Sequence, residues 1–351
     1  MKVPYRVKYT LKRIGLLIVT TFIILTLTFF LVKMLPGAAM TGNDVAQRAY
    51  CENQVALGYY LRFSQEQSAY GAVKLIYNDP TGLTYYYYEK PIALQYGAWL
   101  KGIVTEWNWG VSSVIKPSAS AMNIIMERLG PSIKVNIWAL IISVPLGFIF
   151  GIWAALKKNT VTDSIISTLV MVLISVPSFV VISVLMLIFC FKLHIFPSSW
   201  PSANAALGQR ILGYFIPVMA LCFGTIASFT RYTRAELCEV MSSDFLLLAR
   251  TKGLSKNQCI VRHALRNSLV PIIPMIIGQF VGILSGSMVL EQLYGIPGIG
   301  SLFVKCINLK DYNVLLVDMA VYTLIGLFAN LLVDLSYGIV DPRIRMGAKA
   351  S

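Results

Sequence analysis

Residues 246–267 read LLLARTKGLSKNQCIVRHALRN, a basic and polar stretch in an otherwise apolar part of the chain. Apolar segments at about 211–230 and 269–290 lie on either side, and each is as long as the roughly 20 residues that cross a bilayer. A basic stretch enclosed by two such segments indicates that the chain leaves the membrane here and enters it again. The fold therefore depends on how many such segments the whole sequence contains.

Composition also indicates a polytopic membrane protein. The chain is 56% hydrophobic and only 13% charged, whereas soluble domains carry roughly 25% charged residues. The net charge of +14 could indicate a nucleic-acid-binding protein, but cytoplasmic loops of membrane proteins collect Lys and Arg as well. Six cysteines without CxxC or CxxH spacing and only two histidines predict neither a disulfide framework nor a metal or histidine-based catalytic centre.

Six segments are long and apolar enough to span a bilayer, so we expect an all-α polytopic fold with six transmembrane helices. They lie at about 14–35, 132–156, 164–190, 211–230, 269–290 and 316–338. The first resembles a signal peptide in its basic flank, but its apolar core exceeds the roughly 7–15 residues of such a peptide, so we predict a retained anchor. Residues 132–338 would form the membrane core, and residues 36–131 would form an insert between the first two helices.

The distribution of Lys and Arg predicts that both termini are cytoplasmic. With the N-terminus inside, seventeen of these residues lie in the tail 1–13, the loop after the second span, the loop 231–268 and the tail 339–351. The short outer loops hold only four. The insert is left out of this comparison because long loops cross the membrane largely regardless of charge. Its tyrosines (YYYYEK, 85–90) and three tryptophans indicate a small folded or membrane-lying domain outside the cell.

Within the basic stretch, local signals predict two short helices joined at a glycine. Ser243 or Asp244 would cap the first helix, and Gly253 would end it. Ser255 and Gln258 have the spacing of a capping box, which would begin the second helix. This segment could be an amphipathic helix on anionic lipid, or a docking element for a soluble partner. A docking element explains why two capped helices meet at a glycine turn, whereas a helix lying on lipid does not require such a turn.

Residues 249–271, ARTKGLSKNQCIVRHALRNSLVP, closely resemble the cytoplasmic EAA loop of permeases in ATP-binding-cassette importers. The similarity is to the dipeptide, oligopeptide and nickel branch, whose loop has the form A-R-x-K-G-L, then R-H-A-L-R-N-x-L, then Pro. Further motifs of this family follow one another in the expected order. They are LPG (35–37), QYGAWLKG (95–102), WGVS (109–112), IMERLGPSIKVN (125–136), VPSF (176–179), EQLYGIPGIGSL (291–302), KDYNVL (310–315) and NLLVDLSYGIVDPRIR (330–345).

The resemblance implies a type I importer permease in a bacterial cytoplasmic (inner) membrane. Its partners would be a second homologous permease, two ATPase subunits and an extracytoplasmic substrate-binding protein. ATP and Mg²⁺ would bind to the ATPase subunits, and the present chain would hold no cofactor and would not be an enzyme. Consistent with this, no GxxxxGK[ST] phosphate loop occurs in the sequence.

The resemblance further implies that residues 244–256 couple the permease to the ATPases. The implied coupling residues are Asp244, Ala249, Arg250, Lys252, Gly253, Leu254, Ser255 and Lys256. The two cations could instead reflect only the positive-inside rule. Leu247 and Leu248 stand where the generic loop has Glu and Ala. A possible outer gate comprises Glu291, Gly295, Pro297, Gly298 and Gly300, with an ordinary interfacial loop as the alternative.

Peptide import is the function that this resemblance implies, with import of nickel or another small solute as the alternative within the family. A stand-alone secondary transporter is a second alternative. It is disfavoured because the ionisable residues Lys33, Glu291, Asp318 and Asp334 lie near the ends of predicted spans and not at mid-depth. A membrane enzyme is disfavoured because no catalytic cluster of Ser, His and Asp residues is visible in the sequence.

Overall fold

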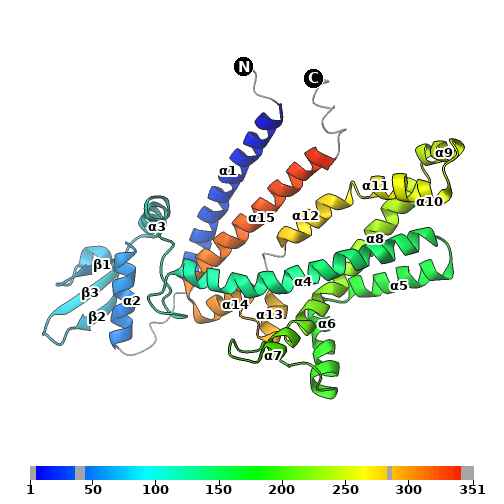
Figure 1. Ribbon diagram of the computed structural model, residues 1–351. Helices are drawn as coiled ribbons and strands as arrows, with labels where there is room; N and C mark the ends of the chain where they lie inside the picture. Colours follow the sequence, from blue (N-terminus) through cyan, green and yellow to red (C-terminus); the bar gives the residue numbers. More distant parts are fainter. Residues whose placement is uncertain (1–4, 36–43, 283–286, 341–351) are drawn as a thin grey trace. The chain divides into compact units, whose positions relative to one another are not determined.

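The computed structural model describes residues 5–35, 44–282 and 287–340. Their α-helices, in chain order, are α1 (Tyr5–Met34), α2 (Asp44–Ala56), α3 (Ile92–Glu106), α4 (Ala121–Leu156), α5 (Val161–Ser175), α6 (Ser178–Leu185), α7 (Leu207–Leu212), α8 (Phe215–Met241), α9 (Asp244–Thr251), α10 (Lys256–Cys259), α11 (Leu265–Ser268), α12 (Ile272–Gly282), α13 (Met288–Tyr294), α14 (Ile299–Leu309) and α15 (Tyr312–Val340). A 3₁₀ turn, η1 (Ser68–Tyr70), and two π-helical stretches, η2 (Met186–Lys192) and η3 (Ile260–Ala264), complete the helical elements (Figure 1).

The chain divides into two compact units. The described residues of 1–17, 130–301 and 325–351 form the first unit, and those of 18–129 and 302–324 form the second. The first holds most of the predicted membrane core and the basic stretch, and the second holds the predicted insert.

Four helices are long and apolar enough to cross a membrane: α1, α4, the α7–α8 segment and α15. Two bent helix pairs, α5 with α6–η2 and α10–α11 with α12, bring the number to six if each pair is one span. The helical membrane part thus agrees with the predicted fold class. Several helices begin or end elsewhere than predicted. α4 begins at Ala121 and not at 132, and α8 continues to Met241, beyond the predicted end at 230.

The largest difference concerns the predicted third span, 164–190. It is not one helix, because α5 and α6–η2 meet at an angle of 98°. Val176 has an extended backbone (φ −88°, ψ 119°) and precedes Pro177. A residue before proline avoids the helical region because of a clash with the proline ring, and the proline itself has no N–H to continue the helix.

The predicted fifth span, 269–290, is also interrupted. The helix α12 covers Ile272–Gly282, residues 283–286 lie outside the described part, and α13 begins separately at Met288. Pro271 lies at the break where α10–α11 meets α12 at 53°.

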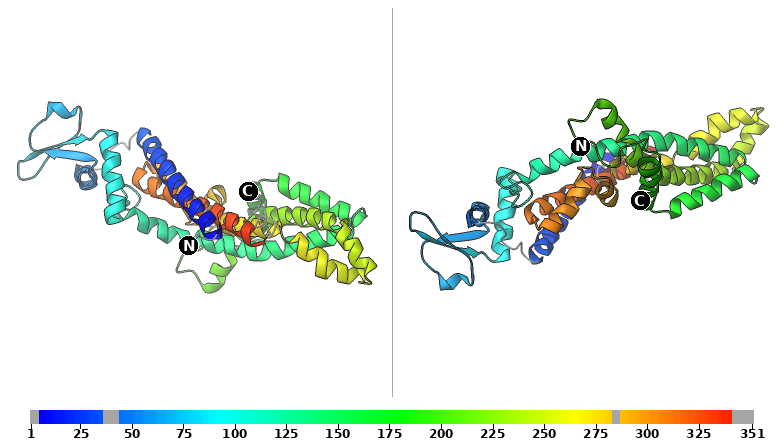
Figure 2. Two further views of the ribbon diagram at one scale, coloured as in Figure 1. Left: turned by 90° about the horizontal axis from the view of Figure 1, so that it is seen from above. Right: turned by 90° about the horizontal axis from the view of Figure 1, so that it is seen from below.

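In the first unit, α4, α5 and α8 run side by side (Figures 1 and 2). Two glycines one turn apart on α4 allow it to approach α8 closely. A Cβ added to Gly147 would lie 2.5 Å from the Cβ of Phe229, and one on Gly151 would lie 2.5 Å from the Cβ of Thr233. Small residues at this spacing are a common contact between membrane helices, because van der Waals packing replaces the hydrophobic effect there. The α4–α8 pair is therefore a fixed part of the unit.

In the second unit, three antiparallel strands form a sheet in the order β1–β3–β2: β1 (Tyr60–Phe63), β2 (Val73–Asn78) and β3 (Thr84–Glu89). The helix α2 covers one face of it (Figure 1). Neighbouring side chains on a strand point to opposite faces, and Tyr87 and Tyr88 are both fully buried. Tyr87 donates to Glu52 on α2 at 2.6 Å, whereas Tyr88 packs beside Phe63. The tyrosine run that indicated a folded insert is thus the central strand of a sheet covered on both sides.

The same unit contains a carboxylate enclosed by a loop. Asp311, just before α15, is fully buried and accepts a hydrogen bond from the Ser112 hydroxyl at 2.6 Å. The backbone N–H groups of residues 113–115 also donate to it, at 3.0–3.1 Å. Asn313 completes the connection by donating to the Val111 carbonyl at 3.0 Å. The WGVS and KDYN motifs are therefore two sides of one contact.

A surface ion pair of this unit involves Arg62 and Glu52. Arg62 and Tyr87 both donate to the Glu52 carboxylate, at 2.8 Å and 2.6 Å. Burial raises the pKa of Glu52, but these two hydrogen bonds outweigh it and hold the pKa below its ordinary value. At neutral pH, the glutamate is therefore ionised and connects α2 to β1 and β3.

Candidate functional site

The basic stretch forms a sharp elbow, which we define as residues 243–259. α8 ends at Met241, and α9 begins at Asp244 after a single extended residue, Ser243. The Ser243 hydroxyl does not cap α9, because it donates to the Val240 carbonyl at 2.6 Å. Asp244 lies in the first turn of α9, where a negative charge interacts favourably with the helix dipole. The sequence offered Ser243 or Asp244 as the cap, and neither makes a side-chain cap.

The elbow turns at Gly253. The N–H of Leu254 donates to the Ala249 carbonyl at 3.3 Å, and the N–H of Gly253 donates to the Arg250 carbonyl at 3.0 Å. These two bonds form a Schellman motif, which satisfies the last carbonyls of α9. Gly253 has φ +89°, and a Cβ there would meet nothing within 4 Å. The position therefore favours glycine because of its backbone conformation, not because of lack of space.

The second helix of the elbow begins with the predicted capping box. The Gln258 N–H donates to the Ser255 hydroxyl at 3.3 Å, and the Ser255 N–H donates to the Gln258 side-chain oxygen at 3.1 Å. Two N–H groups that a helix start leaves unpaired are thereby satisfied. Both sides of the glycine turn are fixed, so the elbow holds one shape.

One face of the elbow packs into the protein. Leu246, Ala249 and Cys259 are buried in a cluster with Ala155 on α4 and Leu237 on α8, and Leu254 packs against this cluster. Ala249 and Leu254, predicted as contact or geometry residues of the coupling loop, pack the elbow against the membrane helices. Asp244, Arg250, Lys252, Gly253, Ser255 and Lys256 are all exposed.

The outward face of α9 is apolar. Phe245, Leu247 and Leu248 are 43%, 63% and 56% exposed, respectively. We call these three residues the α9 face. The sequence prediction did not include them, although the replacement of the generic Glu and Ala by Leu247 and Leu248 was the available signal. Exposed apolar residues grouped beside charged ones are typical of a protein contact surface.

A partly buried ion pair connects the helix that carries the elbow to its neighbour. Arg234 on α8 donates through Nε and Nη2 to the two oxygens of Asp163 on α5, at 2.6 Å and 2.7 Å. The Asn159 N–H and the Ser167 hydroxyl donate to the same carboxylate, at 3.0 Å and 3.3 Å. A bidentate pair of this kind fixes orientation as well as distance. In the sequence, Arg234 is one of the basic residues of the loop 231–268, and no local pattern indicates Asp163 as its partner.

A second buried carboxylate organises the residues predicted to form an outer gate. Glu291 on α13 is 2% exposed. It accepts from the Ser132 hydroxyl on α4 at 2.6 Å and from the Ser301 N–H on α14 at 2.9 Å. Ser132 in turn accepts from the Ile299 N–H at 3.0 Å. Ser132 was not predicted, because Glu291 lies 159 residues away in sequence. Ser301 lies ten residues from Glu291, within the EQLYGIPGIGSL motif, but was not singled out.

Two of the predicted glycines leave room for α13. A Cβ on Gly298 would lie 2.3 Å from both Glu291 Oε2 and Ser132 Oγ, and one on Gly300 would lie 2.8 Å from Met288 Cα and 3.1 Å from Glu291 Oε2. Gly295 has a different role, since it ends α13 with φ +71°. Pro297 is half-buried between them. Glu291, Gly298 and Gly300 therefore form one site, while Gly295 and Pro297 shape the chain around it.

The other predicted ionisable residues near span ends also have neighbours. Asp334 pairs with Arg13 at 2.9 Å. Lys33 lies 4.1 Å above the centre of the Tyr59 ring. Across the described ranges of the chain, no group of three or more His, Cys, Asp and Glu side chains could hold a metal ion.

Comparison with known proteins gives one family. Residues 147–346 match the family described as "Binding-protein-dependent transport system inner membrane component". The chain is 36% identical to the dipeptide transport system permease protein DppB of Lactococcus lactis, over 97% of this chain and 100% of that protein. It is 32% identical to the oligopeptide transport system permease protein OppB of Escherichia coli, over 96% and 99%. A solved amino acid ABC transporter chain covers 62% of this chain and 94% of its own, with 16% identity and a TM-score of 0.46.

Proposed function

We propose the function of this chain from its family, because the chain belongs to the binding-protein-dependent transport system inner membrane components. It is a multi-pass membrane protein and a transport subunit. We propose that it is the permease subunit of an ATP-driven importer of dipeptides or oligopeptides. Its relatives over nearly the full length are named as permeases for these two substrate classes.

The partners in this proposal are a second permease of similar fold, two ATPase subunits and an extracytoplasmic substrate-binding protein. ATP and Mg²⁺ bind to the ATPase subunits. Both termini and the elbow face the cytoplasm in a bacterial inner membrane, and the insert faces outward. The distribution of Lys and Arg supports this orientation.

The observation that carries the proposal is the doubly fixed elbow with its exposed α9 face. An ATPase subunit that moves during nucleotide binding can move a membrane helix only through a rigid connection. The Schellman turn and the capping box supply rigidity within the elbow. The buried cluster with Leu237 connects it to α8, and the Asp163–Arg234 pair connects α8 to α5. Motion of the α9 face would therefore reach both helices.

On the other side of the membrane, the Glu291 site would hold the segment between α13 and α14 in place. Its carboxylate connects α13, α14 and α4 through two hydrogen bonds. In the proposed transport cycle, this segment is an outer gate that keeps its shape while the helices move.

Uptake by intact cells tests the substrate class. Deletion of this chain from its host should abolish uptake of a radiolabelled di- or tripeptide and leave uptake of ⁶³Ni²⁺ unchanged. Expression of the chain from a plasmid should restore peptide uptake. Loss of nickel uptake with normal peptide uptake would contradict the proposal and favour the nickel alternative.

A further inference from the structure

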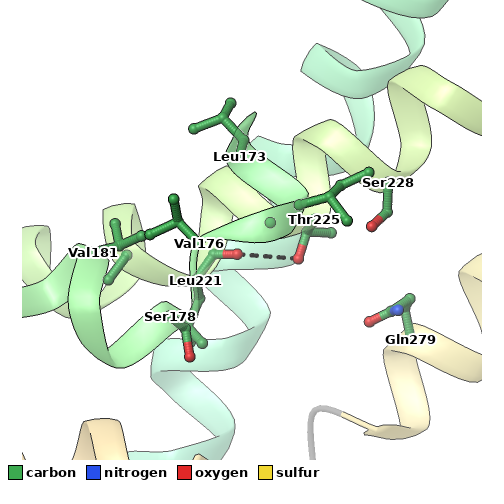
Figure 3. A pocket seen from close by; sticks show the side chains of 11 residues that line it. Leu173, Val176, Ser178, Val181, Leu221, Thr225, Ser228 and Gln279 are labelled. Carbon is green, nitrogen blue, oxygen red and sulfur yellow. Dashed lines mark hydrogen bonds between the residues drawn. The ribbon is translucent and has the colours of Figure 1, made fainter. Parts of the chain in front are cut away.

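The first unit contains a cavity of about 310 Å³ at the break between α5 and α6. Its lining comes from both sides of Pro177, from the middle of α8 and from α12 (Figure 3). Ligand sites typically measure roughly 300–1,000 Å³, so this cavity has room for a part of a peptide and not for a folded partner. The bend of 98° at Pro177 is what opens it between helices that would otherwise pack.

The lining of the cavity is uncharged and combines apolar with polar side chains, and the cavity is partly open. Its polar side chains are Ser178 on α6, Thr225 and Ser228 on α8, and Gln279 on α12. Figure 3 shows Gln279 across the opening from the two α8 residues. None of the residues that line the cavity carries a charge. The site therefore offers hydrogen bonds without selecting for the charge of a ligand.

Three of these side chains are available for a ligand. Thr225 donates to the Leu221 carbonyl at 3.1 Å, as a threonine in a membrane helix commonly does. Ser178, Ser228 and Gln279 make no side-chain hydrogen bond to any other residue that the structure describes. Ser178 and Gln279 are exposed and Ser228 is half-buried, so all three side chains are open to a molecule in the cavity. A lipid chain would leave them unsatisfied, whereas a peptide supplies both N–H and C=O groups.

Gly224 makes room at the centre of the cavity wall. It lies on α8 one residue before Thr225, and a Cβ added there would meet nothing within 4 Å. The space in front of Gly224 is thus part of the cavity. A Cβ at this position would point into open space, and a larger side chain would occupy part of the cavity.

We propose that this cavity is a subsite that binds the backbone of the peptide in transit, through Ser178, Ser228 and Gln279. All peptides share the same backbone amide groups. An uncharged site that binds these groups can therefore accept peptides of different sequence. This inference rests on the proposed function and adds to it the residues that the substrate touches.

The test uses the complete importer in proteoliposomes with saturating peptide-loaded binding protein. Gly224→Leu should lower the initial rate of tripeptide uptake at least about tenfold, comparable to losing roughly two neutral hydrogen bonds. Gly326→Leu is the matched control, because a Cβ at Gly326 in α15 also meets nothing within 4 Å and Gly326 does not line the cavity. It should transport like the wild type. Equal rates for Gly224→Leu and the wild type would overturn the proposal.

A second variant tests backbone recognition. Gln279→Leu keeps the approximate size of the side chain but removes its hydrogen bonds, and should lower uptake about fivefold. The loss should be equal for acidic, neutral and basic tripeptides. A loss of uptake confined to one charge class of tripeptide would contradict a site for the peptide backbone. Unchanged uptake of all three classes would contradict it as well, as would a cavity that binds only lipid. Failure of the wild-type assembly to transport any peptide would instead refute the proposed function itself.

Discussion

At the scale of single residues, a few backbone and side-chain requirements fix the elbow and the segment between α13 and α14. Gly253 is needed for its φ of +89°, whereas Gly298 is needed because a Cβ would lie 2.3 Å from the Glu291 carboxylate. Both glycines belong to motifs of the family, but the physical reasons differ. Substitutions at the two positions should therefore fail in different ways.

A substitution at Gly253 tests the backbone requirement. Gly253→Val places a β-branched residue in the left-handed region, where a non-glycine residue costs about 1–2 kcal/mol or more. We expect the turn to change shape, so that ATP hydrolysis by the assembled importer no longer responds to peptide-loaded binding protein. Gly253→Asn is the matched control, because Asn tolerates this region.

The Gly253 variants are compared in purified assemblies by ATP hydrolysis with and without loaded binding protein. Gly253→Asn should keep most of the stimulation and Gly253→Val should lose most of it. Equal stimulation in the two variants would show that the turn geometry is not what transmits the signal.

At the scale of elements, α9 is a helix with two different faces. Leu246 and Ala249 fix it to α4 and α8, and the α9 face points outward. Because the inward face is fully packed, an incoming partner can use only the outward one. Asp163 and Arg234 then join α8 to α5 below this contact. The proposed coupling path therefore leads from the ATPase subunit to α9, then to α8 and then to α5.

The α9 face can be tested with a pair of equally exposed leucine and valine side chains. Leu247 and Val261 are 63% and 64% exposed, and both lie in the basic stretch. Leu247→Arg puts a charge into the proposed contact, and we expect the ATPase subunits to dissociate during purification of the complex, since burying an unpaired charge costs several kcal/mol. Val261→Arg, outside the α9 face, should retain them. The amount of ATPase subunit that co-purifies is the measurement, and equal retention would contradict the contact.

Local sequence signals predicted these elements better than their pairings. The capping box at Ser255 and the glycine stop at Gly253 follow from a few adjacent residues, and both are present. Within η3, Ile260 and Ala264 are buried, whereas Val261 is exposed.

At the scale of the whole molecule, non-local contacts are what the sequence did not predict. The Ser132–Glu291 bond joins residues 159 positions apart, and the Arg234–Asp163 pair joins residues 71 apart. The spacing of apolar and polar residues along the sequence does not predict such pairs. The number of apolar segments and the basic loops could be predicted, since both depend on composition along short windows. The angle of the bend at Pro177 depends on how α5 and α6 pack around α8, which short stretches of sequence do not determine.

We expect this chain to move peptides only when partner ATPases drive it. The most direct measurement is uptake of a labelled tripeptide into proteoliposomes that contain either the full assembly or this chain alone, with and without ATP. The account predicts uptake only by the full assembly, only with ATP and loaded binding protein. Uptake by the chain alone without ATP would contradict it and would identify a secondary transporter.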